Sequence, residues 1–156
     1  MFTALNLKPF SPLDKKRSAV QLVFLFVIIL AAMFYGTYLI SRDNMRKSNL
    51  KAIVNAVYTF ANDHNGRLPN TLGQDTMYNF PVTKTCIGTK APCFDLGAGG
   101  SYATTETIVP DYLDQIPSDP RVNSYENTQY YIYKNDDGKI VGSATGELGT
   151  ELVIMK

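Results

Sequence analysis

The chain has 156 residues and a formal net charge of +1, and 45% of its residues are hydrophobic. The charge is unevenly distributed: residues 1–18 and 42–67 each carry a net +3, whereas residues 68–156 carry six basic and eleven acidic side chains. Nucleic-acid binding requires clustered Lys and Arg that meet phosphates, so we expect no nucleic-acid partner for the acidic part of the chain.

The first predicted element is a membrane-spanning helix, preceded by a basic tail over residues 1–18. The run from Ala19 to Ile40 contains no charged residue, and as a helix it would be about 33 Å long, enough to cross a hydrocarbon core of about 30 Å. It is longer than the apolar part of a cleaved signal peptide, and a domain this small could not bury it on all sides. We therefore expect a retained transmembrane helix over residues 19–41.

The direction of insertion does not follow from the flanking charges. Four basic residues precede the apolar run and four follow it (Lys8, Lys15, Lys16, Arg17; Arg42, Arg46, Lys47, Lys51). The positive-inside rule therefore does not choose between the two orientations.

The two cysteines, Cys86 and Cys93, favour one orientation. They lie close together in a turn-rich stretch, which predicts a disulfide. A zinc site is the rival, although two thiolates without a nearby His are a poor ligand set, and free thiols would fit a cytoplasmic domain. A disulfide forms in an oxidising compartment, so we expect the N-terminus in the cytoplasm and the C-terminal domain outside it.

Residues 42–65 predict an amphipathic continuation of the same helix. Leu50, Val54, Val57 and Ala61 recur at three- and four-residue steps, and Asn65-Gly66 supplies a left-handed stop. The apolar stripe is expected to pack against the chain's own distal domain.

Beyond the helix, residues 66–128 predict a loop region that contains the Cys86–Cys93 loop and a short helix over residues 107–116. Residues 129–156 predict a three-stranded antiparallel sheet with strands over 129–134, 139–144 and 151–155, because β-forming residues alternate with Asp-Gly and Gly-containing turns. The predicted fold class is α+β, with a long N-terminal helix packed against a small C-terminal antiparallel sheet.

No pattern predicts an enzyme. The lone His64 falls at the predicted helix end, where we expect a solvated capping residue, and a single His leaves only Ser-Lys arrangements for nucleophilic catalysis.

Three pieces in order resemble a known family: the apolar helix running into a basic segment that ends near Leu68-Pro69, the Ile116-Pro-Ser-Asp-Pro120 element, and the tyrosine-rich Tyr130-Tyr-Ile-Tyr133. Together they resemble type IV pilins and type II secretion pseudopilins, and major pseudopilins in particular. The prepilin cleavage motif is missing, since Ser18 stands where that family has Gly and Val23 where it has Glu. A membrane-retained relative is therefore expected.

This resemblance implies a non-enzymatic structural subunit of a type IV pilus or type II secretion apparatus that assembles through its long helix. The implied partners are the lipid bilayer, pilin-like subunits or assembly proteins, and further copies of the chain. It also implies a candidate calcium loop, because some major pseudopilins bind calcium after the Pro-x-Asp-Pro element (here Asp119, Asn123, Ser124 and Glu126). The alternatives are a single-pass sensor or accessory protein with a ligand-binding head, and a membrane-tethered Ser-Lys hydrolase.

Overall fold

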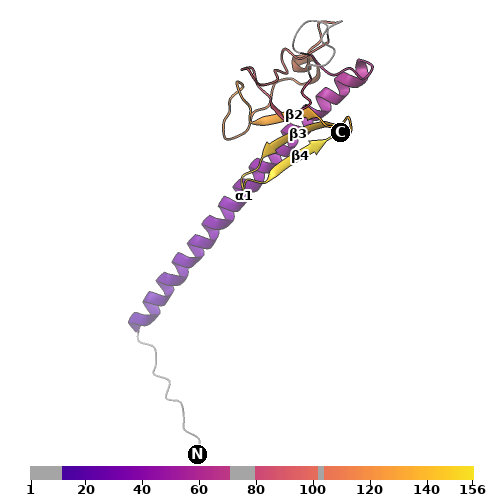
Figure 1. Ribbon diagram of the computed structural model, residues 1–156. Coiled ribbons are helices and arrows are strands. Elements are labelled where there is room, and N and C mark those ends of the chain that lie inside the picture. Colours follow the sequence, from indigo (N-terminus) through magenta and orange to yellow (C-terminus); the bar gives the residue numbers. More distant parts are fainter. Residues whose placement is uncertain (1–11, 71–79, 102–103) are drawn as a thin grey trace, which may run out of the picture. The chain divides into compact units, whose positions relative to one another are not determined.

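A computed structural model of the chain describes residues 12–70, 80–101 and 104–156, with side chains from Arg17 onward. Residues 1–11 of the predicted tail and residues 71–79 and 102–103 of the predicted loop region lie outside this description. The chain divides between Leu39 and Ile40 into two compact units. Helix α1, labelled in Figure 1, contributes to both.

Helix α1 runs from Pro12 to Asp63. It begins inside the segment predicted as a tail, at a proline, a residue that suits the first helical position because its missing N–H would have no helical partner there. It ends as predicted, with Asn65 and Gly66 at φ values of 56° and 81°. The Gly66 N–H donates to the Ala61 carbonyl over 2.7 Å, which satisfies one of the last carbonyls of the helix.

The sheet has four antiparallel strands, in the order β1-β2-β3-β4. The strands are β1 (Thr85–Cys86), β2 (Tyr130–Lys134), β3 (Ile140–Thr145) and β4 (Glu151–Met155). The last three confirm the predicted meander within a residue at each end. The three-stranded prediction was wrong in missing β1, which has two residues and therefore no alternation that a pattern could reveal. Its Thr85 pairs with Ile132 and its Cys86 with Tyr131.

One face of the sheet packs on the second part of α1 and forms the core. The two come close at Gly142 on β3, where an added Cβ would lie 2.8 Å from Val54 Cγ2 and 3.4 Å from Leu50 Cδ2. The predicted apolar stripe of the helix is buried, and so are the facing positions of the strands (Leu50, Ile53, Val54, Val57, Phe60; Tyr130, Ile132, Ile140, Ala144, Leu152). The α+β fold with a helix on a small antiparallel sheet is thus confirmed.

The predicted short helix over residues 107–116 was largely wrong. Only a π-helical turn, Ile108–Tyr112, is present, and it is interrupted at Val109, whose φ and ψ are −116° and 122°. Val109 precedes Pro110, and the residue before a proline favours extended backbone over the α region. A regular helix therefore cannot form across this point.

Candidate functional site

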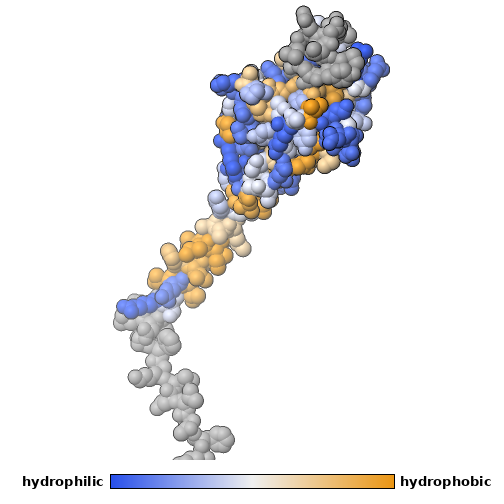
Figure 2. Space-filling view, in the orientation of Figure 1, coloured by the Kyte–Doolittle hydropathy of each residue, from blue (hydrophilic) through white to orange (hydrophobic). Residues whose placement is uncertain are grey.

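The first unit consists, in its described part, of the apolar portion of α1. One helix there is long and apolar enough to span a membrane, and its most apolar window has none of its residues buried. Figure 2 shows hydrophobic side chains over this portion of α1 and a largely hydrophilic surface over the second unit. Phe24, Met33 and Phe34 are each more than half exposed. The described part of the first unit therefore presents an extended, uncharged apolar surface from Ala19 onward.

The second unit contains a buried charge cluster centred on Arg46, a residue of α1 with no exposed surface. Its Nε and Nη2 donate to the two carboxylate oxygens of Asp119 over 2.6 and 3.0 Å. Its Nη1 lies 2.7 Å from Asp43 Oδ1 and 2.8 Å from Glu147 Oε1. Such paired, bidentate contacts are the geometry in which a buried guanidinium is best compensated.

Glu147, in the turn between β3 and β4, extends the cluster. Arg42 Nε lies 3.0 Å from its Oε1, and Arg121 binds its Oε2 through Nη2 and through Nε at 3.1 Å. The Glu147 backbone N–H donates to Asp43 Oδ1 over 3.0 Å. Three segments distant in sequence are thereby tied together: the helix, the loop after Pro117 and the β3–β4 turn.

These contacts change the acidity of both carboxyl groups. Hydrogen bonds from Arg121 and Arg46 outweigh the effect of burial and lower the pKa of Glu147 from 4.5 to about 2. Burial raises the pKa of Asp119, but the hydrogen bonds from Arg46 and from the Arg121 backbone N–H outweigh it and hold that pKa below its usual value. Both groups are therefore anionic at neutral pH.

The spacing of Arg46 along the helix indicates that it belongs to the core-facing side. Arg46 lies four residues before Leu50, on the same helical stripe as Leu50, Ile53 and Val57, so a charged residue was placed in line with the core. We instead counted Arg46 among the topology-setting charges and Asp119 among possible calcium ligands.

The four candidate calcium ligands have different surroundings in the structure. Asp119 is buried against Arg46, whereas the Glu126 side chain is 70% exposed and lies 3.6 Å from Lys90 Nζ. Asn123 is exposed, and Ser124 is half-buried. Among the described residues, no group of three or more His, Cys, Asp or Glu is arranged to hold a metal ion.

The cysteine loop has the predicted bond. Cys86 and Cys93 are joined by a disulfide, with their Cα atoms 4.6 Å apart. Cys86 belongs to β1, and the Phe94 N–H donates to the Cys86 carbonyl over 2.7 Å. The bond therefore closes a small loop onto the first strand of the sheet.

His64 contacts a carbonyl of the last helical turn, as the expected capping residue would, but it is not solvated. Its ring stacks on Phe60 with the centroids 4.0 Å apart, and its side chain is 12% exposed. Nδ1 lies 2.8 Å from the Phe60 carbonyl and Nε2 lies 3.1 Å from Glu106 Oε2. The Tyr112 ring packs against Phe60 and His64 at the helix end. Tyr112 is distant in sequence, so the local sequence around His64 could not reveal this burial.

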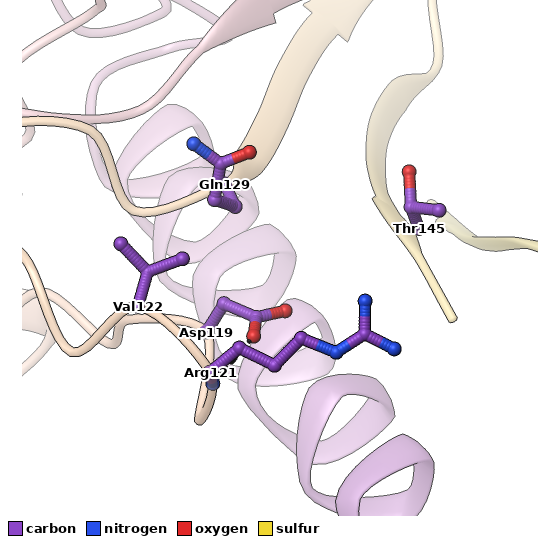
Figure 3. Close-up of a pocket in the computed structure, with 5 residues that line it drawn as sticks. All are labelled: Asp119, Arg121, Val122, Gln129 and Thr145. Atoms are coloured by element: carbon purple, nitrogen blue, oxygen red, sulfur yellow. Dashed lines mark hydrogen bonds between the residues drawn. The ribbon is translucent and has the colours of Figure 1, made fainter. Parts of the chain in front are cut away.

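The second unit has two shallow hollows, the first of them beside the charge cluster. Figure 3 shows the first, of about 120 Å³, between the loop that carries Asp119, Arg121 and Val122 and the residues Gln129 and Thr145. The second, of about 340 Å³, includes Cys93 and Glu126 in its lining and shares Val122 and Gln129 with the first. The first is well below the size of typical ligand pockets and the second is at their lower limit, about 300 Å³.

Compared with models of known families, with curated proteins and with solved structures, the chain matches none.

Proposed function

We propose that this protein is a pilin-like or pseudopilin-like structural subunit, anchored in a membrane by the apolar part of α1 and assembled with similar subunits through that helix. The observation that carries the proposal is the uncharged helical surface of the first unit, none of whose most apolar window is buried. Lipid and neighbouring helices are the two environments that cover such a surface stably.

The Ile116-Pro-Ser-Asp-Pro120 element supports the same proposal. Asp119 within it accepts hydrogen bonds from both Nε and Nη2 of Arg46 on the helix. The element therefore binds the loop region to the helix close to Ile40, where the apolar segment ends. A subunit that is held in an assembly by its helix needs its head fixed to that helix.

In this proposal the protein is non-enzymatic, its N-terminus lies in the cytoplasm and its head lies outside. The Cys86–Cys93 disulfide supports that orientation, because such bonds persist in oxidising compartments. The proposed partners are lipid, pilin-like subunits or their assembly proteins, and further copies of the chain.

The test is to shear cells that produce the protein and to ask whether it is recovered in a high-mass filament fraction. A control variant, Phe34→Asp, places a charge in the middle of the exposed apolar surface and should remove the protein from that fraction. Recovery of the wild-type protein only as a membrane-bound monomer would overturn the proposal. Mass spectrometry of the same material reports whether residues 1–18 are removed.

A single-pass sensor or accessory protein is the second candidate. Val23 stands where the resembled family has Glu, and it offers no charge for a neighbouring subunit's N-terminus. The hollow beside Cys93 provides a surface at which such a head could bind a small ligand. This function predicts a membrane-bound protein that is absent from filaments and whose thermal stability increases with its ligand.

A further inference from the structure

The turn between β3 and β4 carries an apolar residue in an unusual position. Leu148 is 81% exposed, more than any other large hydrophobic side chain in the described part of the chain, including those of the apolar helix. Isolated exposed apolar residues are common and need no explanation by themselves. Leu148 needs an explanation because of where it lies along α1.

Strand β3 runs antiparallel to α1, so the turn after it points toward the N-terminal side of the helix. The contacts along the second unit give this direction. Lys156, which pairs with Ile140 at the start of β3, reaches Asn55 on the helix, and Gly142 lies against Leu50 and Val54. Further along, the backbone N–H of Glu147 reaches Asp43. In Figure 1 the loop between β3 and β4 accordingly lies beside α1.

The turn is also held firmly at that level. Its backbone is bound from two sides, by Asp43 of the helix at the Glu147 N–H and by Arg121 Nη2 at the Glu147 carbonyl over 3.2 Å. It is closed by hydrogen bonds from Gly146 to Thr150 and from Gly149 to Gly146. Leu148 therefore projects from a fixed support.

We propose that Leu148 inserts into the interfacial layer of the bilayer that holds α1. Asp43 follows Ile40, the last residue of the apolar run, by about 4.5 Å along the helix axis. The polar layer on each side of the hydrocarbon core is about 5–7 Å thick. In this proposal the turn bound to Asp43 lies at the depth of the headgroups, and the leucine that projects from it reaches the boundary between headgroups and acyl chains. This inference rests on the proposed membrane anchoring.

The test uses the full chain in phosphatidylcholine vesicles at a low ratio of protein to lipid, with one labelled cysteine at a time. Both native cysteines are in the disulfide, so an introduced cysteine is the single free thiol for an environment-sensitive nitrobenzoxadiazole probe. Three sites are compared: Leu148→Cys, Val27→Cys in the middle of the apolar run, and Val82→Cys. Val82 is the matched control, because it is 73% exposed and follows Pro81, which is bonded to Lys134 at the opposite end of the sheet.

We expect the probe at position 148 to emit at shorter wavelength than the probe at position 82 and to lose intensity with quenchers attached near the lipid headgroup. The probe at position 27 should lose intensity chiefly with quenchers placed deep in the acyl chains. If position 27 is quenched while position 148 behaves like position 82, this inference is overturned and the anchoring stands. If position 27 is not quenched by lipid, the proposed anchoring is itself wrong.

A second copy of the chain is the competing occupant of Leu148. A blue-shifted probe at position 148 that is insensitive to lipid quenchers, together with disulfide cross-linking of Leu148→Cys between two copies in the same vesicles, would overturn the proposal in favour of that occupant.

Discussion

Arg46 occupies a position that an apolar side chain fills one turn later, at Leu50. Its guanidinium has no exposed surface and meets three carboxylates, of which Asp119 takes both parallel hydrogen bonds. Taking a charge out of water is costly, and the cost is recovered only when the remaining donors and acceptors are matched. The main effect of the cluster is therefore to fix one arrangement of helix, loop and turn. Its net contribution to the free energy of unfolding is smaller.

We predict that Arg46→Met destabilises the head by about 3 kcal/mol, because the buried Asp119 carboxylate loses its charged partner. The Arg121 backbone N–H still donates a hydrogen bond to that carboxylate. The measurement is urea unfolding of the full chain in detergent micelles, followed by near-ultraviolet circular dichroism of the tyrosines. The double variant Arg46→Met with Asp119→Leu should recover much of the loss, since the unpaired charge is gone. Equal stability of Arg46→Met and wild type would show that the cluster does not hold the head.

The lowered pKa values of Glu147 and Asp119 predict how the stability of the head changes with pH. Both groups bind protons less tightly in the folded state, so their contribution to stability is present above their unfolded pKa. It is lost as the pH falls from about 4.5 through the folded pKa of Glu147, about 2. We expect the unfolding midpoint in micelles to fall over this range and to fall less steeply in Glu147→Gln. A midpoint that rises on acidification would contradict the assigned contacts.

At the scale of elements, β3 lies very close to α1. Gly142 on β3 faces Val54 and Leu50, and no side chain fits between strand and helix at that point. The sheet can therefore lie directly on the apolar stripe, with Tyr130 and Ile132 of the neighbouring strand buried beside it.

Gly142→Ala is predicted to destabilise the head by about 1–3 kcal/mol, because its Cβ would lie too close to Val54 and overpacked cores must shift backbone or rotamers. Gly36→Ala is the matched control: nothing lies within 4 Å of the Cβ it would introduce. Urea unfolding of the two variants in micelles should separate them clearly. Equal midpoints for both would argue that strand and helix are farther apart than described.

Elements with a strong local pattern were predictable from sequence. The helix, its stop at Asn65-Gly66 and the strands β2, β3 and β4 each follow from periodicity and turn residues. Strand β1 and the burial of His64 were not, since each depends on segments that meet only in the folded chain. The Arg46–Asp119 pair joins residues 73 positions apart.

At the scale of the whole molecule, the two compact units differ in how they treat apolar surface. The second unit buries its apolar stripe under its own sheet, whereas the described part of the first exposes its apolar surface along α1. The proposed membrane anchoring and the proposed assembly through α1 would each cover this exposed apolar surface.

The most direct test is labelling from the two sides of the membrane with a membrane-impermeant maleimide, using Ser18→Cys and Asp137→Cys in separate full-length chains. Both positions are exposed, and they lie before and well beyond the apolar run. In intact spheroplasts we predict that Asp137→Cys reacts and that Ser18→Cys reacts only after detergent opens the membrane. Equal reaction of both sites in intact spheroplasts would contradict a helix that crosses the bilayer with its head outside.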